Sequence, residues 1–117
     1  MSELTADKCE ACRGGVPTLT DAELRELLPQ VPGWRVTEVQ GVKRIERTFE
    51  FPDFRTALAF TNEVGELAER EGHHPDIHLA WGKVRVETWT HAIQGLHRND
   101  FILAAKASEL YTPAAKR

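Results

Sequence analysis

Two segments of alternating hydrophobicity, separated by a long amphipathic stretch, constrain the fold of this chain most. From Val42 to Phe51, apolar side chains fall mainly on odd positions and polar ones on even positions, and a similar alternation runs from Ile77 to Trp89. A period of two predicts strands with one buried face and one solvent face. A further strand is expected over Trp34 to Val39. Turns are expected at Gln40-Gly41 and at Gly82-Lys83, so the sequence predicts two β-hairpins.

Three helices are expected around these hairpins. After Pro52-Asp53, apolar residues recur at three- and four-residue spacing and the pattern ends at Gly72, which favours a long amphipathic helix. A capping box at 20–23 predicts a short helix that runs to about Pro29. A third helix is expected from about Asn99 to Tyr111. The order α-β-β-α-β-β-α predicts an α+β fold, a four-stranded antiparallel sheet with three helices on one face.

The chain of 117 residues is the size of one domain. Residues 1–18 show no periodicity and are expected to form an N-terminal tail, which leaves 19–117 as a single domain. One sheet face and at least one strand edge stay uncovered in this arrangement. We therefore expect a homo-oligomer, either a homodimer or a homotetramer.

Charge and hydropathy exclude several classes of function. There are 15 basic and 18 acidic residues, a net charge of -3, and neither sign forms a long block. A nucleic-acid partner is not expected from such a balance. The polar, acidic N-terminus does not resemble a signal peptide, and no apolar stretch approaches the length of about 20 residues that a membrane span needs. A cytoplasmic protein without a membrane partner is expected.

Cys9 and Cys12 form one CxxC pair in the predicted tail. Such a pair is compatible with a redox site or with half of a zinc site. A structural zinc site needs four ligands, and no second pair of suitable spacing follows in the N-terminal third. The two cysteines are therefore interpreted as ordinary thiols.

The candidate catalytic residues are three histidines. His73 and His74 stand between the helix-ending Gly72 and Pro75, and His91 is expected to close the fourth strand. A turn at Gly82-Lys83 would place positions 75–76 across from positions 90–91. The three imidazoles should then meet at one end of the sheet.

Histidine has an ordinary pKa of about 6.5, so it can both donate and accept a proton near neutral pH. A cluster of three therefore suits general acid-base catalysis without a metal or cofactor. A three-histidine zinc site with an open position, with or without the two cysteines, is the competing interpretation. His78 and His97, outside the cluster, are interpreted as exposed or structurally hydrogen-bonded residues.

These residues carry a resemblance to a known family. The shared pattern comprises Glu69-Arg70-Glu71-Gly72-His73-His74-Pro75-Asp76, Trp81-Gly82-Lys83-Val84-Arg85-Val86, Thr88-Trp89-Thr90-His91, and Gly95-Leu96 with Asp100. It resembles the signature of the pterin-4a-carbinolamine dehydratases. The resemblance extends from about Leu19 to Leu110. The spacing from His-His-Pro to Thr90-His91 makes it specific.

The resemblance implies an enzyme that turns 4a-hydroxytetrahydropterin into quinonoid dihydropterin, the recycling step after aromatic amino acid hydroxylation, with a functional link to a hydroxylase. It implies His73, His74 and His91 as catalytic residues, and a pterin site lined by Glu69, Pro75, Thr90, Ala92 and Ile93. Glu69 would be a supporting carboxylate. The alternative for Glu69 is an exposed carboxylate that pairs with Arg70 or Lys83.

The chain departs from the family pattern at two positions that would carry polar side chains around the site. Gly72 stands where some members have an acidic residue, and Asn99-Asp100 stands where some have Arg-Asp. Trp89 replaces a small residue of some relatives and is interpreted as a strand-packing residue, with a narrower pocket or a subunit contact as the alternatives. The resemblance also covers interaction modules, which dimerise transcription factors or assist assembly of a carbon-fixing enzyme. An interaction module is therefore the alternative function.

Overall fold

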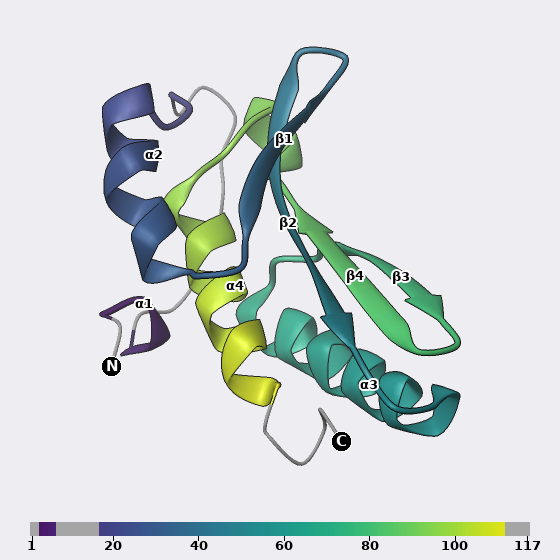
Figure 1. The fold of residues 1–117 in the computed structure, drawn as a ribbon. Coiled ribbons are helices and arrows are strands. Elements are labelled where there is room, and N and C mark those ends of the chain that lie inside the picture. Colours follow the sequence, from purple (N-terminus) through teal and green to yellow (C-terminus); the bar gives the residue numbers. More distant parts are fainter. Residues whose placement is uncertain (1–2, 7–16, 112–117) are drawn as a thin grey trace.

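The computed structural model describes residues 3–6 and 17–111 (Figure 1). Its helices are α1 (Glu3–Ala6), α2 (Asp21–Leu27), α3 (Phe54–Glu71) and α4 (Arg98–Leu110), and two 3-10 turns, η1 (Leu28–Gln30) and η2 (His91–Ile93), accompany them. The strands are β1 (Arg35–Val39), β2 (Val42–Glu50), β3 (Asp76–Ala80) and β4 (Lys83–Thr88). The predicted order α-β-β-α-β-β-α is confirmed for α2 through α4, and the α+β class with it.

The four strands form one antiparallel sheet in the order β1-β2-β4-β3. Each hairpin contributes neighbouring strands, and β2 pairs with β4 to join the two hairpins. The apolar face of the sheet includes Ile45, Phe49, Val84 and Val86, all almost fully buried. The alternation read from the sequence therefore decides which face of the sheet meets the helices.

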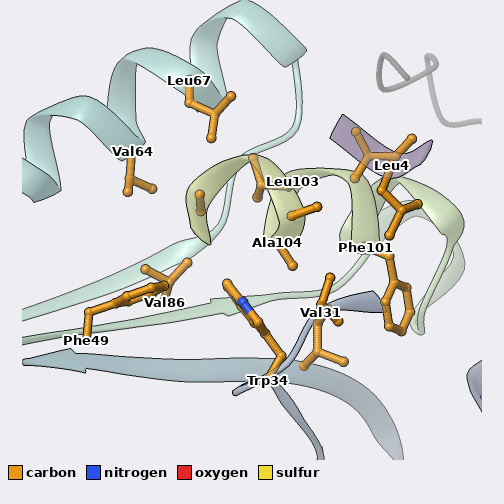
Figure 2. Packing of buried hydrophobic residues seen from close by; sticks show 14 of the residues in the cluster. Leu4, Val31, Trp34, Phe49, Val64, Leu67, Val86, Phe101, Leu103 and Ala104 are labelled. Carbon is orange, nitrogen blue, oxygen red and sulfur yellow. The ribbon is translucent and has the colours of Figure 1, made fainter. Parts of the chain in front are cut away.

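The core lies between this apolar face and the helices. In Figure 1, α4 is seen between α2 and α3. Figure 2 shows Val64 of α3 and Leu103 of α4 on the side of the helices that faces Phe49 and Val86. These residues belong to one continuous hydrophobic cluster, to which α2 also contributes buried leucines. All three longer helices thus bury apolar surface in the same core.

Local signals fix the ends of the helices as the sequence predicted. Thr20 and Glu23 form the capping box of α2. The carboxylate of Asp53 caps α3, because its Oδ1 accepts hydrogen bonds from the backbone N–H of Thr56 at 2.8 Å and from the Thr56 hydroxyl at 2.7 Å. Gly72 ends α3 in the left-handed conformation, with φ of 66°. That conformation favours glycine.

The turn of the second hairpin lies one residue earlier than predicted, and the predicted register is therefore wrong. Ala80 pairs with Lys83, so the turn residues are Trp81 and Gly82 rather than Gly82-Lys83. Moving a two-residue turn by one position shifts every cross-strand partner by two. Asp76 consequently faces Glu87 and does not lie across from positions 90–91. Apolar alternation is the same in both registers, so it could not distinguish them.

The other sheet face is partly covered by its own charged side chains. Glu46 and Glu87 face each other across β2 and β4 and are both nearly buried. Arg35 pairs with Glu46 at 2.8 Å, and Arg44 pairs with Glu87 at 3.3 Å. Arg85 contacts both carboxylates. The expected homo-oligomer stays a prediction.

The N-terminal segment contains one element that the sequence did not indicate. Helix α1 lies against α4, and Leu4 is fully buried in the hydrophobic cluster. A four-residue helix is too short to show a period in the sequence. Cys9 and Cys12 lie outside the described residues. Among the helices that the structure describes, none has the length and apolarity to cross a bilayer.

Candidate active site

The end of α3 positions the two adjacent histidines. The left-handed Gly72 turns the chain sharply, and the backbone N–H of His73 still donates to the carbonyl of Ala68 at 3.2 Å. His73 is consequently directed into the protein, where it is buried, whereas the next residue, His74, is exposed. A single backbone corner therefore gives the two imidazoles different environments.

The buried histidine lies against a fully buried carboxylate. Nε2 of His73 is 2.6 Å from Oδ1 of Asp100 and 3.3 Å from Oγ1 of Thr88. Asp100 also accepts hydrogen bonds from the hydroxyls of Thr88, at 2.7 Å, and Thr90, at 2.8 Å. The backbone N–H of His97 donates to the same carboxylate at 3.0 Å. These five residues form one hydrogen-bond network around Asp100.

The exposed histidine has its own carboxylate. Nε2 of His74 lies 2.6 Å from Oε2 of Glu69, and both side chains are more than half exposed. Glu69 is five residues before His74, so the left-handed corner at Gly72 brings the imidazole back to the last turn of the helix. The structure therefore pairs Glu69 with His74, rather than with Arg70 or Lys83 as the alternative interpretation had it.

His91 does not close the fourth strand, contrary to the sequence prediction. Strand β4 ends at Thr88, and His91 begins η2. The reason is a small loop in which Thr90 and Gly95 exchange backbone hydrogen bonds of 2.8 and 3.4 Å. The exposed His91 ring packs on Trp89, with 4.6 Å between ring centroids. The guanidinium of Arg44 stacks on the same indole at 3.7 Å.

The three histidines are not brought into one contact network. Within the described chain, no hydrogen bond, ion pair or ring contact joins His91 to His73 or His74. Nor are three histidine, cysteine, aspartate or glutamate side chains of residues 3–6 and 17–111 placed so that they could hold a metal ion together. The geometry offers two separate histidine–carboxylate pairs and one histidine on an aromatic ring, a set of groups that can exchange protons.

The other residues predicted to line the site differ in their exposure and in their hydrogen-bond partners. Pro75 and Ile93 are half-buried and Ala92 is exposed, so all three are accessible. Thr90 is buried, its hydroxyl donates to Asp100, and its backbone N–H donates to Gly95. Its side chain is therefore committed to the protein.

The two histidines outside the predicted cluster behave as interpreted. His78 is exposed on β3. His97 is the N-cap of α4, where its Nδ1 accepts from the backbone N–H of Asn99 at 3.0 Å.

Asp100 and Thr88 were missed as site residues by the sequence reasoning. Thr88 continues the buried alternation of Val84 and Val86, so a polar side chain was due to enter the core and would need a partner there. Asp100 stands three residues after the N-cap His97, in the position from which an acidic side chain caps a helix. Both signals were present, but neither says that the two residues meet at His73.

Comparison with known proteins bears on this arrangement. A family model described as pterin 4 alpha carbinolamine dehydratase matches residues 17–110. The chain belongs to this family. Two proteins with provisional names as pterin-4-alpha-carbinolamine dehydratases are similar to it. One, from Gloeobacter violaceus, is 54% identical over 107 residues, which cover 92% of each chain. The other, from Chlorobium luteolum, is 52% identical over 111 residues, 95% of this chain and 97% of its own.

Two solved structures resemble the fold of this family member. A crystal structure described as a transcriptional coactivator/pterin dehydratase from Brucella melitensis has a TM-score of 0.74 and 33% identity, and covers 82% of this chain and all of its own. A pterin dehydratase-like protein, identified as a RuBisCO assembly factor in the alpha-carboxysome, has a TM-score of 0.59 and 20% identity, and covers 70% of this chain and 93% of its own. At that identity, the second structure supports the fold alone.

Proposed function

We propose that this chain removes water from a 4a-hydroxytetrahydropterin to give quinonoid dihydropterin. Family membership supports the reaction class. The observation that carries the proposal for the site is the pair of adjacent histidines, each with a carboxylate 2.6 Å from its Nε2. An imidazole with an adjacent carboxylate is a common unit of general acid-base catalysis, because the carboxylate orients the ring and stabilises its protonated form.

The reaction needs two proton transfers. An acid protonates the departing hydroxyl, the carbon–oxygen bond breaks and water leaves, while a base takes the proton of the neighbouring ring nitrogen and a carbon–nitrogen double bond forms. The proposed site offers His73, His74 and His91 for these steps. Glu69 supports His74 from the solvent side.

The proposed binding surface is formed by the α3–β3 corner and by η2. Pro75, Ala92 and Ile93 would contact the pterin, and Thr90 would hold the loop before η2 through its bonds to Gly95 and Asp100. Backbone groups there suit the edge of a pterin, which carries both donors and acceptors. In this proposal the enzyme acts in pterin recycling, after the reaction of an aromatic amino acid hydroxylase. The reaction involves no nucleic-acid partner.

A coupled assay with enzymatically generated 4a-hydroxytetrahydropterin tests the proposal. His74→Ala and His91→Ala should each lower turnover by about 100-fold, the scale of a lost acid or base. The matched control is His78→Ala, which removes an exposed imidazole from β3 and should leave turnover unchanged. Wild-type rates in both site variants would reject the assignment. A wild-type protein without activity would favour the alternative, an interaction or assembly module of the same fold.

A further inference from the structure

Asp100 is the most deeply buried charged group of the described chain, and the proposed function does not yet say which atom carries the proton between Asp100 and His73. Its side chain has no exposed surface. Within residues 17–111 it has no lysine or arginine partner, and His73 is its one basic side-chain contact. Burial of a carboxylate is costly unless hydrogen bonds or a charge compensate it. The hydrogen bonds around Asp100 therefore indicate which atom carries the proton between Asp100 and His73.

The two oxygens of Asp100 have different neighbours. Oδ2 accepts from the Thr90 hydroxyl and from the backbone N–H of His97, which opens α4. Oδ1 faces the Thr88 hydroxyl and the ring of His73. Helix capping accounts for the contacts of Oδ2. It does not account for an imidazole at 2.6 Å from Oδ1.

The hydrogen-bond network assigns the proton between His73 and Asp100. The backbone N–H of His97 can only donate, and each threonine hydroxyl has one proton to give to the carboxylate. An ionised carboxylate accepts all of these bonds together with one from His73. Nε2 of His73 then carries a hydrogen, and Nε2 also lies 3.3 Å from Oγ1 of Thr88, which keeps a lone pair free to accept.

The other ring nitrogen of His73 is the one that stays available. In the described chain, Nδ1 of His73 has no hydrogen-bond partner. It is also not one of the buried polar atoms without a partner, which among the described residues are Oγ1 of Thr37 and Nε of Arg44. In the neutral ring with hydrogen on Nε2, Nδ1 presents an acceptor lone pair.

We propose that Asp100 is a positioning residue that holds His73 in the Nε2–H tautomer, so that Nδ1 is the one nitrogen of this ring that can take a proton from a bound pterin. The inference rests on the proposed dehydratase function for its substrate, but not for the tautomer itself. His73 would accept the proton of the ring nitrogen at Nδ1, and the carboxylate of Asp100 would stabilise the imidazolium that forms. The acid that protonates the departing hydroxyl would then be one of the exposed histidines, His74 or His91.

Nitrogen-15 NMR of the histidine rings tests this directly, because protonated and unprotonated ring nitrogens have widely separated shifts. The wild-type protein at neutral pH should show His73 with a protonated Nε2 and an unprotonated Nδ1. Asp100→Asn should give a mixture of tautomers, since an amide offers both a donor and an acceptor. In the dehydratase assay the same variant should lose about 100-fold in kcat with little change in KM.

Glu71→Gln is the matched control. Glu71 is a nearly buried carboxylate two residues from His73 and pairs with Lys106 of α4 at 2.6 Å. Its substitution also removes a buried negative charge, but it should leave the His73 ring shifts and kcat unchanged. A purely structural role of Asp100 would instead lower the stability of Asp100→Asn but leave its His73 ring shifts and its kcat the same as those of Glu71→Gln.

The result that overturns the inference is a wild-type spectrum in which His73 carries hydrogen on Nδ1 or averages between tautomers. That spectrum decides the matter even if Asp100→Asn does not fold. An intact Nε2–H signal in a wild-type protein without dehydratase activity would reject the proposed function and leave the tautomer assignment standing.

Discussion

His73 and His74 are neighbours in the sequence, and each has a carboxylate 2.6 Å from its Nε2, yet the two pairs lie in opposite environments. The side chains of His73 and Asp100 are 9% and 0% exposed, whereas those of His74 and Glu69 are 61% and 73% exposed. The first pair joins α4 to the end of α3, and the second stays within the end of α3. Distance alone therefore says little about what a pair contributes.

The difference is one of solvation. Water replaces a lost partner at an exposed pair, so such pairs contribute about 0–1 kcal/mol. A buried group that loses its partner cannot be solvated, so removal of one member costs about 3–5 kcal/mol. The buried pair should therefore fix geometry, and the exposed pair should leave its proton free to exchange.

The largest expected effect is on stability. Asp100→Ala strands the Thr88 and Thr90 hydroxyls, the His73 ring and the N-cap of α4, and should lower the free energy of unfolding by about 3–5 kcal/mol. Glu69→Ala should lower it by less than about 1 kcal/mol. Urea denaturation followed by circular dichroism measures both. Equal losses would remove the distinction between the pairs.

Double-mutant cycles should show a smaller but more specific difference. His73→Ala combined with Asp100→Asn is expected to give a coupling energy of about 1–3 kcal/mol, because the two groups share one buried network. His74→Ala combined with Glu69→Gln should give about 0.2–1 kcal/mol. The same denaturation experiment supplies both cycles. A larger coupling in the exposed pair would contradict the solvation argument.

The sequence predicted the exposed pair better than the buried one. The family resemblance implied Glu69 as a supporting carboxylate one helical turn before the histidines, and the structure places it 2.6 Å from Nε2 of His74. The contact between His73 and Asp100 joins residues 27 apart and depends on how α4 packs against the end of α3. Periodicity describes one element at a time and does not fix such packing.

The position of His91 could not be read from the sequence for a related reason. A turn at Trp81-Gly82 and a turn at Gly82-Lys83 bury the same face of β4, but they place different residues opposite Asp76. The backbone hydrogen bonds between Thr90 and Gly95 then form the loop in which the strand ends and η2 begins. No residue pattern in 88–95 predicts these hydrogen bonds. The helices, the strands and the class of fold follow from periodicity, whereas the assembly of the site depends on contacts between distant segments.

Salt should separate the two pairs further. The Debye length falls to about 3 Å at 1 M ionic strength, so the coupling of Glu69 and His74 should fall toward zero between low salt and about 1 M NaCl. The coupling of His73 and Asp100 should change little, because both side chains are buried and in direct contact. The cycles are repeated at each salt concentration with the pH held constant. An equal loss of coupling in both pairs would show that water reaches Asp100.

The smallest expected effect concerns Asp53, an exposed carboxylate with partners of a different kind. Hydrogen bonds from the Thr56 hydroxyl, and then from the Thr56 backbone N–H, lower the pKa of Asp53 from the ordinary 3.8. A lowered pKa means that the ionised form stabilises the folded state above the ordinary pKa, and that this contribution is lost as the pH falls through the lowered value. The difference in Tm between wild type and Asp53→Asn should therefore be present at neutral pH and should vanish in strong acid.

Thr56→Val sharpens this last test, because it removes the hydroxyl and keeps the backbone N–H. When Thr56→Val is present in both proteins, the pH-dependent gap in Tm that Asp53→Asn causes should narrow without disappearing. Asp53 is exposed, as Glu69 is, but its partners are already ordered by the first turn of α3, so its hydrogen bonds require little further ordering of the chain. A gap in Tm that does not depend on pH would mean that ionisation of Asp53 adds nothing to the stability of the folded protein, as the solvation argument predicts for an exposed pair such as Glu69 and His74.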